Sequence, residues 1–438
     1  MGGTAGEQGT ATLKVGIIDN LIAYNKVLKD ATPKGTATNP FNLANPTNGA
    51  TSSEITESAN SYLISAPGHY RIPLVYGNAI KNGQTNTNSF HTANTVAYVL
   101  RDFLDHANRP IHYAIIREQN SGNRATQAAV VWQDQPNLIK NASLHINDYP
   151  VQIDGTTKNV DFVEFEVTKN DIRNGNAVIA VKDAGGTILW SWHLWFTHDD
   201  ALNTTACWNY QNKRYDFSEE TLGWKYTVWR RTSYTSPRSI KVKVRQTKGQ
   251  ISPATRTEAV LTITQNPGNT RQGYATFYQF GRKDALPSAG AIAEGNYSFD
   301  SAGGGHSIGY AIQHPWNMFG YAGAGTYTND WCNATYYNLW SMDNTVTGYN
   351  DNAVVKTIYD PCPAGFKMPA SNAFTGFTTN GQNAGPMNTS GAWDNGWNFY
   401  NKIGSPDATV WFPASGYRTD FDGLLYLMDN YGFFWSAV

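Results

Sequence analysis

The pattern of apolar and polar residues predicts a chain built mainly of β-strands. Residues 176–182 and 188–196 are two extended apolar runs on either side of Gly185 and Gly186. Two such runs across a glycine turn are typical of a β-hairpin. Residues 128–132 and 160–167 predict further strands, because both are short and rich in Val, Phe or Trp.

The second strand of this hairpin carries a histidine among tryptophans. The two-residue period of a strand places Trp190, Trp192 and Leu194 on one face, and His193 and Trp195 on the other. A histidine in this position suggests either a ligand or base, or a packed side chain held by hydrogen bonds. We expect the packed side chain, which is the more frequent case between large aromatic residues.

A later group of strands alternates even more clearly. In residues 238–246, Ile240, Val242 and Val244 alternate with lysines and an arginine. This pattern predicts a strand whose apolar residues point inward and whose basic residues face water. We interpret the basic stripe as a solvated sheet face rather than a nucleic-acid surface. Residues 227–231 and 259–265 are expected to be strands of the same group.

The N-terminal part has weaker signals. Residues 11–18 alternate enough to predict a strand, and residues 30–57 are rich in Thr, Asn, Pro and Ala, which is typical of a long loop or linker. Residues 61–68 predict a strand that ends in a Pro-Gly turn, with residues 70–76 as its partner. Residues 94–106 fit both helical spacing and strand composition, so both alternatives stay open.

The C-terminal third consists of Pro/Gly turns that each fix an aromatic residue. Residues 359–369 read YDPCPAGFKMP, residues 412–418 read FPASGYR, and residues 431–436 read YGFFWS. Residues 372–377 predict a short helix, and residues 393–400 predict a second helical turn. None of these segments has the pattern of a nucleophile, a general base or a phosphate-binding loop.

These segments resemble the terminal domain of fimbrillin-like and "major paralogous domain" surface proteins of gut Bacteroidetes. In that family the terminal module is similar to a C-type-lectin fold. Relatives continue with several more strands after the Gly-Phe-Phe-Trp-Ser element, so the resemblance implies that the chain is either cut after Val438 or a short member. The resemblance gives a class of protein and a place in the cell, but no ligand.

We therefore expect a mainly β fold. An antiparallel β-sandwich region, with one or two immunoglobulin-like or fimbrillin-like domains, precedes an α+β C-type-lectin-like domain. The chain of 438 residues is too long for one core. Its expected parts are an N-terminal strand and linker over residues 1–57, the sandwich region over 58–268, and the lectin-like domain over 269–438. The Asn-Pro-Gly-Asn run at 266–269 is the expected boundary.

Composition excludes several functions and fits an exported protein. Charged residues make up 15% of the chain and the net charge is −1, so no basic face indicates nucleic acid or an anionic membrane. No window approaches the roughly 18 apolar residues of a membrane helix. Residues 1–6 read as an expression start fused to a mature segment whose export signal was removed. The resemblance implies export to the outer-membrane surface or a fimbrium.

The sequence contains few residues in patterns typical of a metal site or a catalytic site. Cys207, Cys332 and Cys362 fit no zinc spacing; Cys332 and Cys362 either pair or, with Cys207, remain three free thiols. Asp420 with Asp422 and the Asp394-Asn395-Gly396 run are oxygen clusters of the kind that usually shape turns. We predict no catalytic residue, no metal and no cofactor. An enzyme related to formylglycine-generating folds, implied only by the fold resemblance, is a remote alternative.

Two hypotheses for function follow. The first is a cell-surface adhesin, a pilus-tip or surface lipoprotein subunit whose lectin-like domain binds a host or microbial glycan or surface protein. Aromatic side chains suit such contacts, and the expected ligand-binding residues are Tyr417, Arg418, Tyr426, Tyr431 and Phe433. The alternative is a structural fimbrial subunit that assembles with other pilus subunits by strand addition. Its exchanged strand is expected within residues 12–18 or just after.

Overall fold

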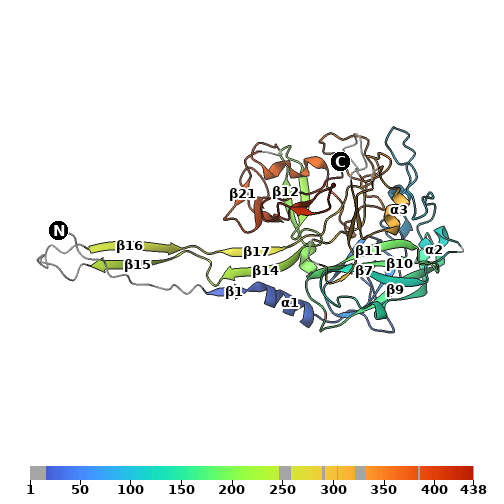
Figure 1. Cartoon of the computed structure of the whole chain (residues 1–438), viewed down its shortest axis with the longest axis horizontal. Helices are drawn as coiled ribbons and strands as arrows, with labels where there is room; N and C mark the ends of the chain where they lie inside the picture. The colour runs from blue at the N-terminus through green and yellow to red at the C-terminus, as the bar shows by residue number, and fades with distance from the viewer. Residues whose placement is uncertain are drawn as a thin grey trace, which may run out of the picture.

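The structure, a computed structural model, describes residues 16–121, 123–245, 258–288, 292–302, 304–320, 331–382 and 385–437. Over these residues the fold is mainly β, as the alternation predicts. A rounded body carries a long two-stranded arm (Figure 1). Among the helices within these ranges, none is long and apolar enough to cross a membrane.

A five-stranded sheet runs through the middle of the body. In order across the sheet, its strands are β18 (Glu294–Gly295), β7 (Gln127–Gln133), β10 (Gly175–Lys182), β11 (Ile188–Phe196) and β3 (Ser61–Ile64). β10 and β11 are antiparallel neighbours with Ile179 opposite Trp192, which confirms the expected glycine-turn hairpin. β3 lies parallel to β11 at the other edge, with Ser61 opposite His193.

A second sheet has four strands. They are β2 (Phe41–Asn42), β4 (Gly68–Pro73), β9 (Thr156–Val167) and β8 (His145–Ile153), in that order. The predicted pairing of residues 61–68 with residues 70–76 is wrong, because β4 pairs with β9 and not with β3. The short connection between β3 and β4 passes from one sheet to the other, and Tyr70 Oη donates across it to the Ala66 carbonyl at 2.6 Å.

Apolar residues of both sheets share one hydrophobic core. Tyr62 and Ile64 of β3, Ile72 of β4 and Phe165 of β9 belong to it, together with Trp192 of β11. All nine residues of β11 are buried, so this strand is covered on both faces. Fully burying a large apolar side chain contributes roughly 1.5–3 kcal/mol, so the tryptophans of β11 are a major source of stability.

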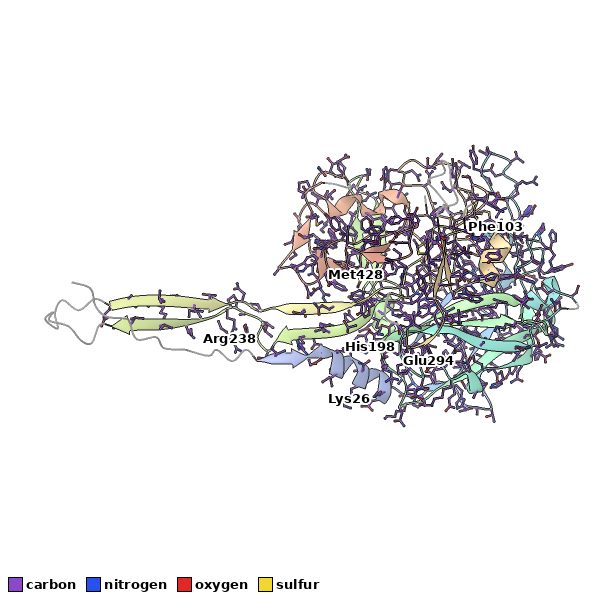
Figure 2. The ribbon with its side chains drawn as sticks, in the orientation of Figure 1. Lys26, Phe103, His198, Arg238, Glu294 and Met428 are labelled. Carbon is purple, nitrogen blue, oxygen red and sulfur yellow. The ribbon has the colours of Figure 1, made fainter. Side chains whose placement is uncertain are left out.

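The arm begins at a three-stranded sheet. β14 (Lys225–Thr232) lies between β1 (Ile17–Asp19) and β17 (Asn269–Tyr274). The chain then continues into β15 (Arg238–Arg245) and returns through β16 (Glu258–Gln265), and within the described ranges these two strands pair only with each other. Figure 2 labels Arg238 where this ribbon leaves the body.

The ribbon corrects one prediction. Ile240, Val242 and Val244 do share one face, but Ile240 and Val244 are exposed rather than turned into a core. Leu261 and Ile263 of β16 lie exposed on the same face. The predicted alternation is confirmed and the predicted burial is wrong, because the ribbon extends away from the body and no described segment buries this face. Residues 11–15 of the predicted N-terminal strand lie outside the described residues.

Helix α1 (Asn20–Asp30) follows β1 and fastens the N-terminal part to the body. Asp19 caps it, since its Oδ1 accepts from Leu21 N at 3.0 Å and Ile22 N at 3.3 Å. Leu28 is fully buried in the main core. In the stretch after the helix, expected to be a loop, Ala44 and Ile55 are also buried in that core.

The remaining elements are short. They are β5 (Ile80–Lys81), β6 (Gln84–Thr85), η1 (Thr87–Ser89), α2 (Ile116–Gln119), η2 (Asn141–Ser143), η3 (Asp199–Leu202), β12 (Thr204–Trp208), β13 (Arg214–Ser218), β19 (Ser298–Asp300), α3 (Ile308–Gln313), β20 (Asn317–Phe319), η5 (Ser371–Phe377), β21 (Thr389–Ser390), β22 (Gly396–Tyr400), β23 (Thr409–Pro413), β24 (Tyr417–Arg418) and β25 (Leu425–Tyr426).

Three of the shorter predictions have clear outcomes. The short helix at 372–377 is present as η5. The helical turn predicted at 393–400 is wrong, because residues 396–400 form β22, an antiparallel partner of β23. Residues 94–106 form no helix and only two isolated bridges, His91 with Asp102 and Leu104 with Pro110.

Segments on either side of residue 268 share sheets and cores. β18 adds to the five-stranded sheet beside β7. Cys207 of β12 lies in one apolar cluster with Phe377, Val410 and Phe412. The expected three-part division of the chain stays a prediction, and any such parts are joined through extensive contacts.

Candidate functional site

Four of the five expected ligand-binding residues belong to one run of neighbouring aromatic rings. Tyr417 of β24 lies opposite Tyr426 of β25, with ring centroids 6.2 Å apart. Phe433 meets Tyr417 edge-on at 4.9 Å and stacks with Tyr431 at 6.2 Å. Phe421 extends the run beyond Tyr426 at 6.4 Å. We call these five rings the aromatic ladder.

The turn between β24 and β25 fixes the ladder. Gly423 has a φ of +68°, a conformation that favours glycine. Asp422 accepts from Leu424 N at 2.9 Å and from Tyr426 Oη at 2.7 Å, and it also contacts the Thr419 hydroxyl. This carboxylate shapes an Asx-type turn. The oxygen cluster at Asp420 and Asp422 therefore includes a residue with a structural role in this turn.

The ladder is largely exposed to solvent. Relative exposure is 69% for Phe421, 38% for Tyr426 and 54% for both Tyr431 and Phe433. Leu424, Leu427 and Trp435 in the same C-terminal stretch are exposed as well. Large contiguous apolar patches are rare on soluble monomers and usually mark interaction sites. Residues 433–435 lie in irregular chain, with Phe433 and Trp435 exposed.

Arg418, the fifth expected contact residue, points inward beneath the ladder. Its guanidinium donates to the Pro287 carbonyl, to the Gly423 carbonyl at 2.5 Å and to Tyr297 Oη at 2.9 Å. It also lies 4.3 Å from the centre of the Tyr297 ring. Burial lowers the pKa of Arg418. In this arrangement Arg418 holds the β24–β25 turn against the body.

A cavity of about 740 Å³ lies beside the ladder, and Phe433 contributes to both. Phe217 of β13, Trp411 and Phe412 of β23, and Phe434 and Trp435 also line it. Trp435 Nε1 donates to the Tyr278 carbonyl at 2.8 Å, which fixes the indole at the cavity wall. A cavity of this size with mainly apolar walls is typical of a small-molecule or side-chain binding site.

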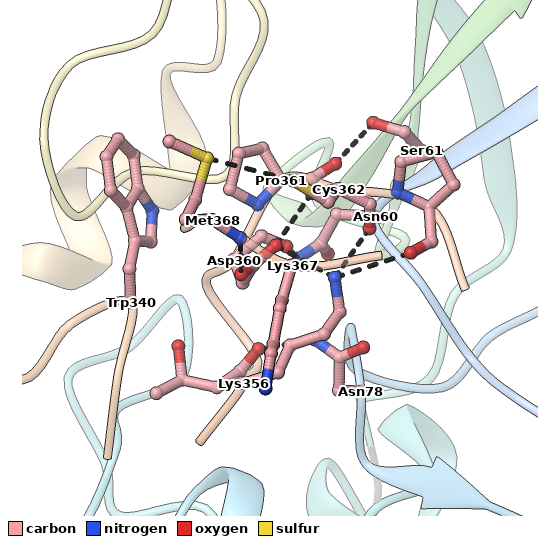
Figure 3. A network of polar contacts seen from close by, with 12 residues as sticks. Asn60, Ser61, Asn78, Trp340, Lys356, Asp360, Pro361, Cys362, Lys367 and Met368 are labelled. Atoms are coloured by element: carbon pink, nitrogen blue, oxygen red, sulfur yellow. Dashed lines mark hydrogen bonds and ion pairs between the residues drawn. The ribbon is translucent and has the colours of Figure 1, made fainter. Parts of the chain in front are cut away.

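The YDPCPAGFKMP segment forms another wall of this cavity, and its polar groups serve the fold. Asp360 is fully buried and accepts from Lys356 Nζ at 2.8 Å, Cys362 N at 2.8 Å and Met368 N at 2.9 Å (Figure 3). These contacts close the turn around Pro361. The hydrogen-bonded segment thus acts as a structural staple.

This staple is anchored to the start of β3. Asn60 Nδ2 donates to the Ile358 and Asp360 carbonyls at 2.7 and 2.8 Å (Figure 3). Ser61 Oγ donates to the Pro361 carbonyl at 2.6 Å. Backbone carbonyls of a buried turn need such donors. These contacts connect residues 300 positions apart and hold the C-terminal part onto the five-stranded sheet.

The cysteines do not form the pair that the sequence left open. Cys362 is a free thiol whose sulfur lies 3.7 Å from Met368 Sδ, and Cys207 is also free. Burial raises the pKa of Cys207 to about 12 and that of Cys362 well above its usual range. Neither is a reactive thiolate at neutral pH. Among the described ranges, no group of three His, Cys, Asp or Glu residues could hold a metal ion.

His193 is packed and hydrogen-bonded, as predicted. Its Nε2 lies 2.9 Å from Asn176 Oδ1, and its Nδ1 lies 3.0 Å from Tyr278 Oη and 3.3 Å from Ser61 Oγ. Burial lowers the pKa of His193 to about 3, so the imidazole is neutral. The neutral ring joins β11 to β3, β10 and the segment that covers the sheet.

Sequence reasoning missed Phe421 as a member of the ladder. The residue lies in the Asp420-Phe421-Asp422-Gly423 turn, which drew attention only for its carboxylates. A large aromatic residue in a polar Asp/Gly turn was the available signal, because such a ring has little chance of burial. No family model, curated protein or solved structure matches this chain, so any functional assignment rests on its own residues and geometry.

Proposed function

We propose that this protein is a cell-surface adhesin that binds a glycan or a surface protein through the aromatic ladder. The single observation that carries the proposal is the run of five neighbouring rings, four of them 38–69% exposed. Exposed aromatic side chains supply rigid contact area at low entropic cost, and they dominate the binding energy of many interfaces. No catalytic role for any residue is part of this proposal.

The chemistry of the ladder supports a ligand with apolar faces. Tyr426 Oη is engaged by Asp422, and Phe421 and Phe433 carry no polar atom. Such rings stack against the C–H faces of sugars or receive apolar side chains of a protein partner. The adjoining 740 Å³ cavity offers a place for one projecting group of the ligand next to Phe433.

We also propose the domain organisation and the cellular location that the family resemblance implies. The two sheets with a shared core would be the immunoglobulin-like or fimbrillin-like sandwich, and the C-terminal part would be the C-type-lectin-like domain. The protein would then act at the outer-membrane surface or at a fimbrial tip, with a host or microbial partner. The common core of the two sheets and the exposed ladder support this proposal.

The test compares a triple variant of the ladder with a double control variant, and every change replaces an exposed aromatic residue by serine. Phe421→Ser, Tyr431→Ser and Phe433→Ser together remove the exposed rings, while Tyr113→Ser with Tyr210→Ser removes two rings that are equally exposed elsewhere. Both proteins are applied to a glycan array and to intact host and bacterial cells. We expect the unmodified protein and the control to bind, and the ladder variant to lose at least tenfold in signal. The proposal would be overturned if the unmodified protein bound neither the glycan array nor cells, or if the unmodified protein, the ladder variant and the control bound equally.

A second candidate is a structural fimbrial subunit, and the arm favours it. The ribbon of β15 and β16 carries exposed Ile240, Val244, Leu261 and Ile263 on one face. An isolated two-stranded ribbon is marginally stable in water, and its open edges accept added strands. Assembly by strand addition would pair the backbone groups at these edges with those of another subunit. Ile240→Lys with Leu261→Lys should then abolish self-assembly, as followed by size-exclusion chromatography and electron microscopy, without loss of cell binding.

A further inference from the structure

A second, more polar groove lies between helix α1, the base of the arm and the turn before β22. Its volume is about 1120 Å³. The residues that matter for its chemistry are Tyr24 of α1, Trp229 of β14, Arg271 of β17, and Trp393 and Asp394 of the turn. We call it the α1 groove. It shares no residue with the aromatic ladder.

Asp394 provides a hydrogen-bond acceptor without a donor. The residue is 3% exposed, and its Oδ2 accepts from Arg271 Nε at 2.6 Å and from Asn269 Nδ2 at 2.7 Å. Its Oδ1 is buried and has no hydrogen-bond partner among the residues that the structure describes. A buried carboxylate oxygen left without a donor is costly. A ligand that donates to Oδ1 would remove that cost.

Trp229 provides a hydrogen-bond donor without an acceptor. Trp229 and Arg271 are direct cross-strand neighbours in the β14–β17 pair, so their side chains rise from the same face of the sheet. The indole stacks on Tyr226 at 4.7 Å and lies 5.7 Å from Tyr24. Its Nε1 is buried and, within the described ranges, also lacks a partner. Asp394 binds Arg271 through Oδ2, and Trp229 is the cross-strand neighbour of Arg271, so both unpaired groups belong to residues next to Arg271.

The two unpaired groups together select the ligand. A hydroxyl group both donates and accepts, so a hydroxyl-bearing molecule can supply the donor that Asp394 Oδ1 lacks and the acceptor that Trp229 Nε1 lacks. A cation would serve only the carboxylate, and Arg271 already neutralises that charge at 2.6 Å. An anion would meet Asp394 as well as Glu219 and Asp200 along the same groove. The lining therefore favours a neutral, hydroxyl-rich molecule.

An exposed indole supplies the apolar part of such a site. Trp393 is 50% exposed and meets Trp397 edge-on at 5.1 Å, so its ring is braced on one side. Asn398, whose Oδ1 accepts from Arg271 Nη2 at 2.9 Å, adds an amide to the lining. An aromatic platform beside a few fixed polar groups is the usual construction of a small-ligand site. Sugars fit it, because they combine hydroxyl edges with an apolar C–H face.

We propose that the α1 groove is a saccharide-binding site, with Trp393 as the stacking platform and Asp394 Oδ1 and Trp229 Nε1 as the hydroxyl-binding pair. The inference does not depend on the aromatic ladder and adds a binding site to whatever the ladder contacts. In a surface adhesin, two sites with different chemistry would allow a glycan to be held at two places along its length. Each site is testable without the other.

The test uses a panel of neutral mono- and disaccharides built from glucose, galactose, mannose and N-acetylglucosamine, at 0.1–50 mM, with the full chain. Binding is followed by saturation-transfer NMR and tryptophan fluorescence. Tetramethylammonium chloride is the cationic probe. We expect at least one saccharide to bind and tetramethylammonium to give no signal. No saccharide binding up to 50 mM, or binding of the cation in place of any sugar, overturns the proposal.

Three variants locate the site. Trp393→Ala removes only a half-exposed ring and should weaken saccharide binding at least tenfold with an unchanged melting temperature. Trp229→Phe keeps the ring stack and deletes the N–H. Asp394→Asn replaces one of the two acceptor oxygens by an amide NH2 and removes the charge. Each variant should bind saccharide roughly three- to tenfold more weakly. Tyr113→Ser with Tyr210→Ser, which removes two exposed rings outside both the groove and the ladder, should bind the panel like the unmodified chain. Unchanged binding by Trp393→Ala, or an equal loss of binding in the Tyr113→Ser, Tyr210→Ser control, overturns the assignment to the groove.

Discussion

Two nitrogens of Arg418 donate to the same carbonyl oxygen of Pro287, Nε at 3.1 Å and Nη2 at 2.5 Å, across 131 positions in the sequence. A third nitrogen reaches the Gly423 carbonyl and Tyr297 Oη. One side chain thus ties the β24–β25 turn, which carries the aromatic ladder, to a segment that covers the five-stranded sheet. The exposed rings are presented by a fixed support.

Arg418→Met should therefore weaken both stability and ladder binding. The expected loss is roughly 2–4 kcal/mol in the free energy of unfolding, because buried carbonyls left without a donor cost about 1–3 kcal/mol each. Urea denaturation measures this change, and the cell-binding assay measures the ladder. Arg418→Lys keeps the positive charge but lacks the forked geometry, so its losses should fall between those of the unmodified protein and Arg418→Met. Full ladder binding by Arg418→Met would contradict the supporting role.

Asp360→Ala should be the most destabilising change in the YDPCPAGFKMP segment. The carboxylate is fully buried and pairs with Lys356 Nζ at 2.8 Å, and breaking a buried ion pair by removing one partner costs roughly 3–5 kcal/mol. Asp407→Ala, which removes a surface partner of Lys402 at 2.8 Å, should leave the free energy of unfolding nearly unchanged, because solvent screens exposed ion pairs. Urea denaturation of both variants distinguishes them. Equal losses would contradict the staple.

Glu220 should make stability depend on pH. Its carboxylate contacts Tyr24 Oη at 3.2 Å, Thr197 Oγ1 at 3.1 Å and Tyr226 Oη at 3.1 Å, and burial raises its pKa from about 4.5 to about 7. The folded protein therefore binds more protons than the unfolded chain between these values. The contribution of Glu220 to the free energy of unfolding is present below pH 4.5 and is lost as the pH rises through 7.

The measurement is a series of urea denaturations from pH 4.5 to 8 on three proteins. Glu220→Gln should remove part of the decline between pH 4.5 and 7, because the amide does not titrate. Glu219→Gln, which changes the exposed neighbouring residue, should retain the full decline. Identical pH profiles for the unmodified protein and Glu220→Gln would show that the carboxylate is not the titrating group.

Removing residues 1–18 should leave a folded monomer, whereas removing residues 1–57 should not. The shorter deletion breaks the pairing of Ile17 with Thr232 and Ile18 with Arg231 but retains Asp19, the cap of α1. The longer one removes Leu28, Ala44 and Ile55 from the main core. Far-UV circular dichroism and thermal melting test the fold of each protein. Loss of a cooperative thermal transition after deletion of residues 1–18 would contradict this prediction.

The shorter deletion also tests the subunit alternative. If assembly uses the N-terminal strand, the folded deletion protein should lose self-association in size-exclusion chromatography while its ladder still binds cells. Unchanged association would exclude this strand as the exchanged element. The Ile240→Lys, Leu261→Lys ribbon variant then identifies whether the arm carries the contact instead.

Cys207 and Cys362 should resist thiol reagents in the folded protein. Burial raises the pKa of both thiols, to about 12 for Cys207, and the protonated thiol is a poor nucleophile. Iodoacetamide at pH 7.5 followed by mass spectrometry should leave both unmodified, and should modify both in 6 M guanidinium chloride. Rapid labelling of Cys362 without denaturant would contradict protection by its raised pKa and its packing against Met368.

The features read correctly from the sequence are those that a few neighbouring residues decide. The β10–β11 hairpin follows from two apolar runs and a Gly-Gly turn, and the packed state of His193 follows from its tryptophan neighbours. The aromatic ladder was found in part for the same reason, since Tyr417, Tyr431 and Phe433 lie within 17 residues of one another. Short turns bring such residues together with little help from the rest of the chain.

The errors share another cause. β3 and β4 were expected to pair, but β3 adds in parallel to β11 and β4 pairs with β9, so that all paired residues lie at least 89 positions apart. Residues 396–400 were expected in a helical turn, but pairing with β23 makes them a strand. Local propensity is weak compared with the free energy of a completed sheet, so the distant partner decides.

By itself, the sequence determined the mainly β character, the turns and the alternating faces, because these follow from backbone geometry over two to ten residues. Only the tertiary structure decided which alternating faces are buried and which unpaired groups meet. Ile240 reads as a core residue until β15 leaves the body, and Asp394 reads as a turn residue until Arg271, 123 positions earlier, binds one of its oxygens. Burial and pairing depend on contacts between distant segments, and the local pattern carries no information about which segments those are.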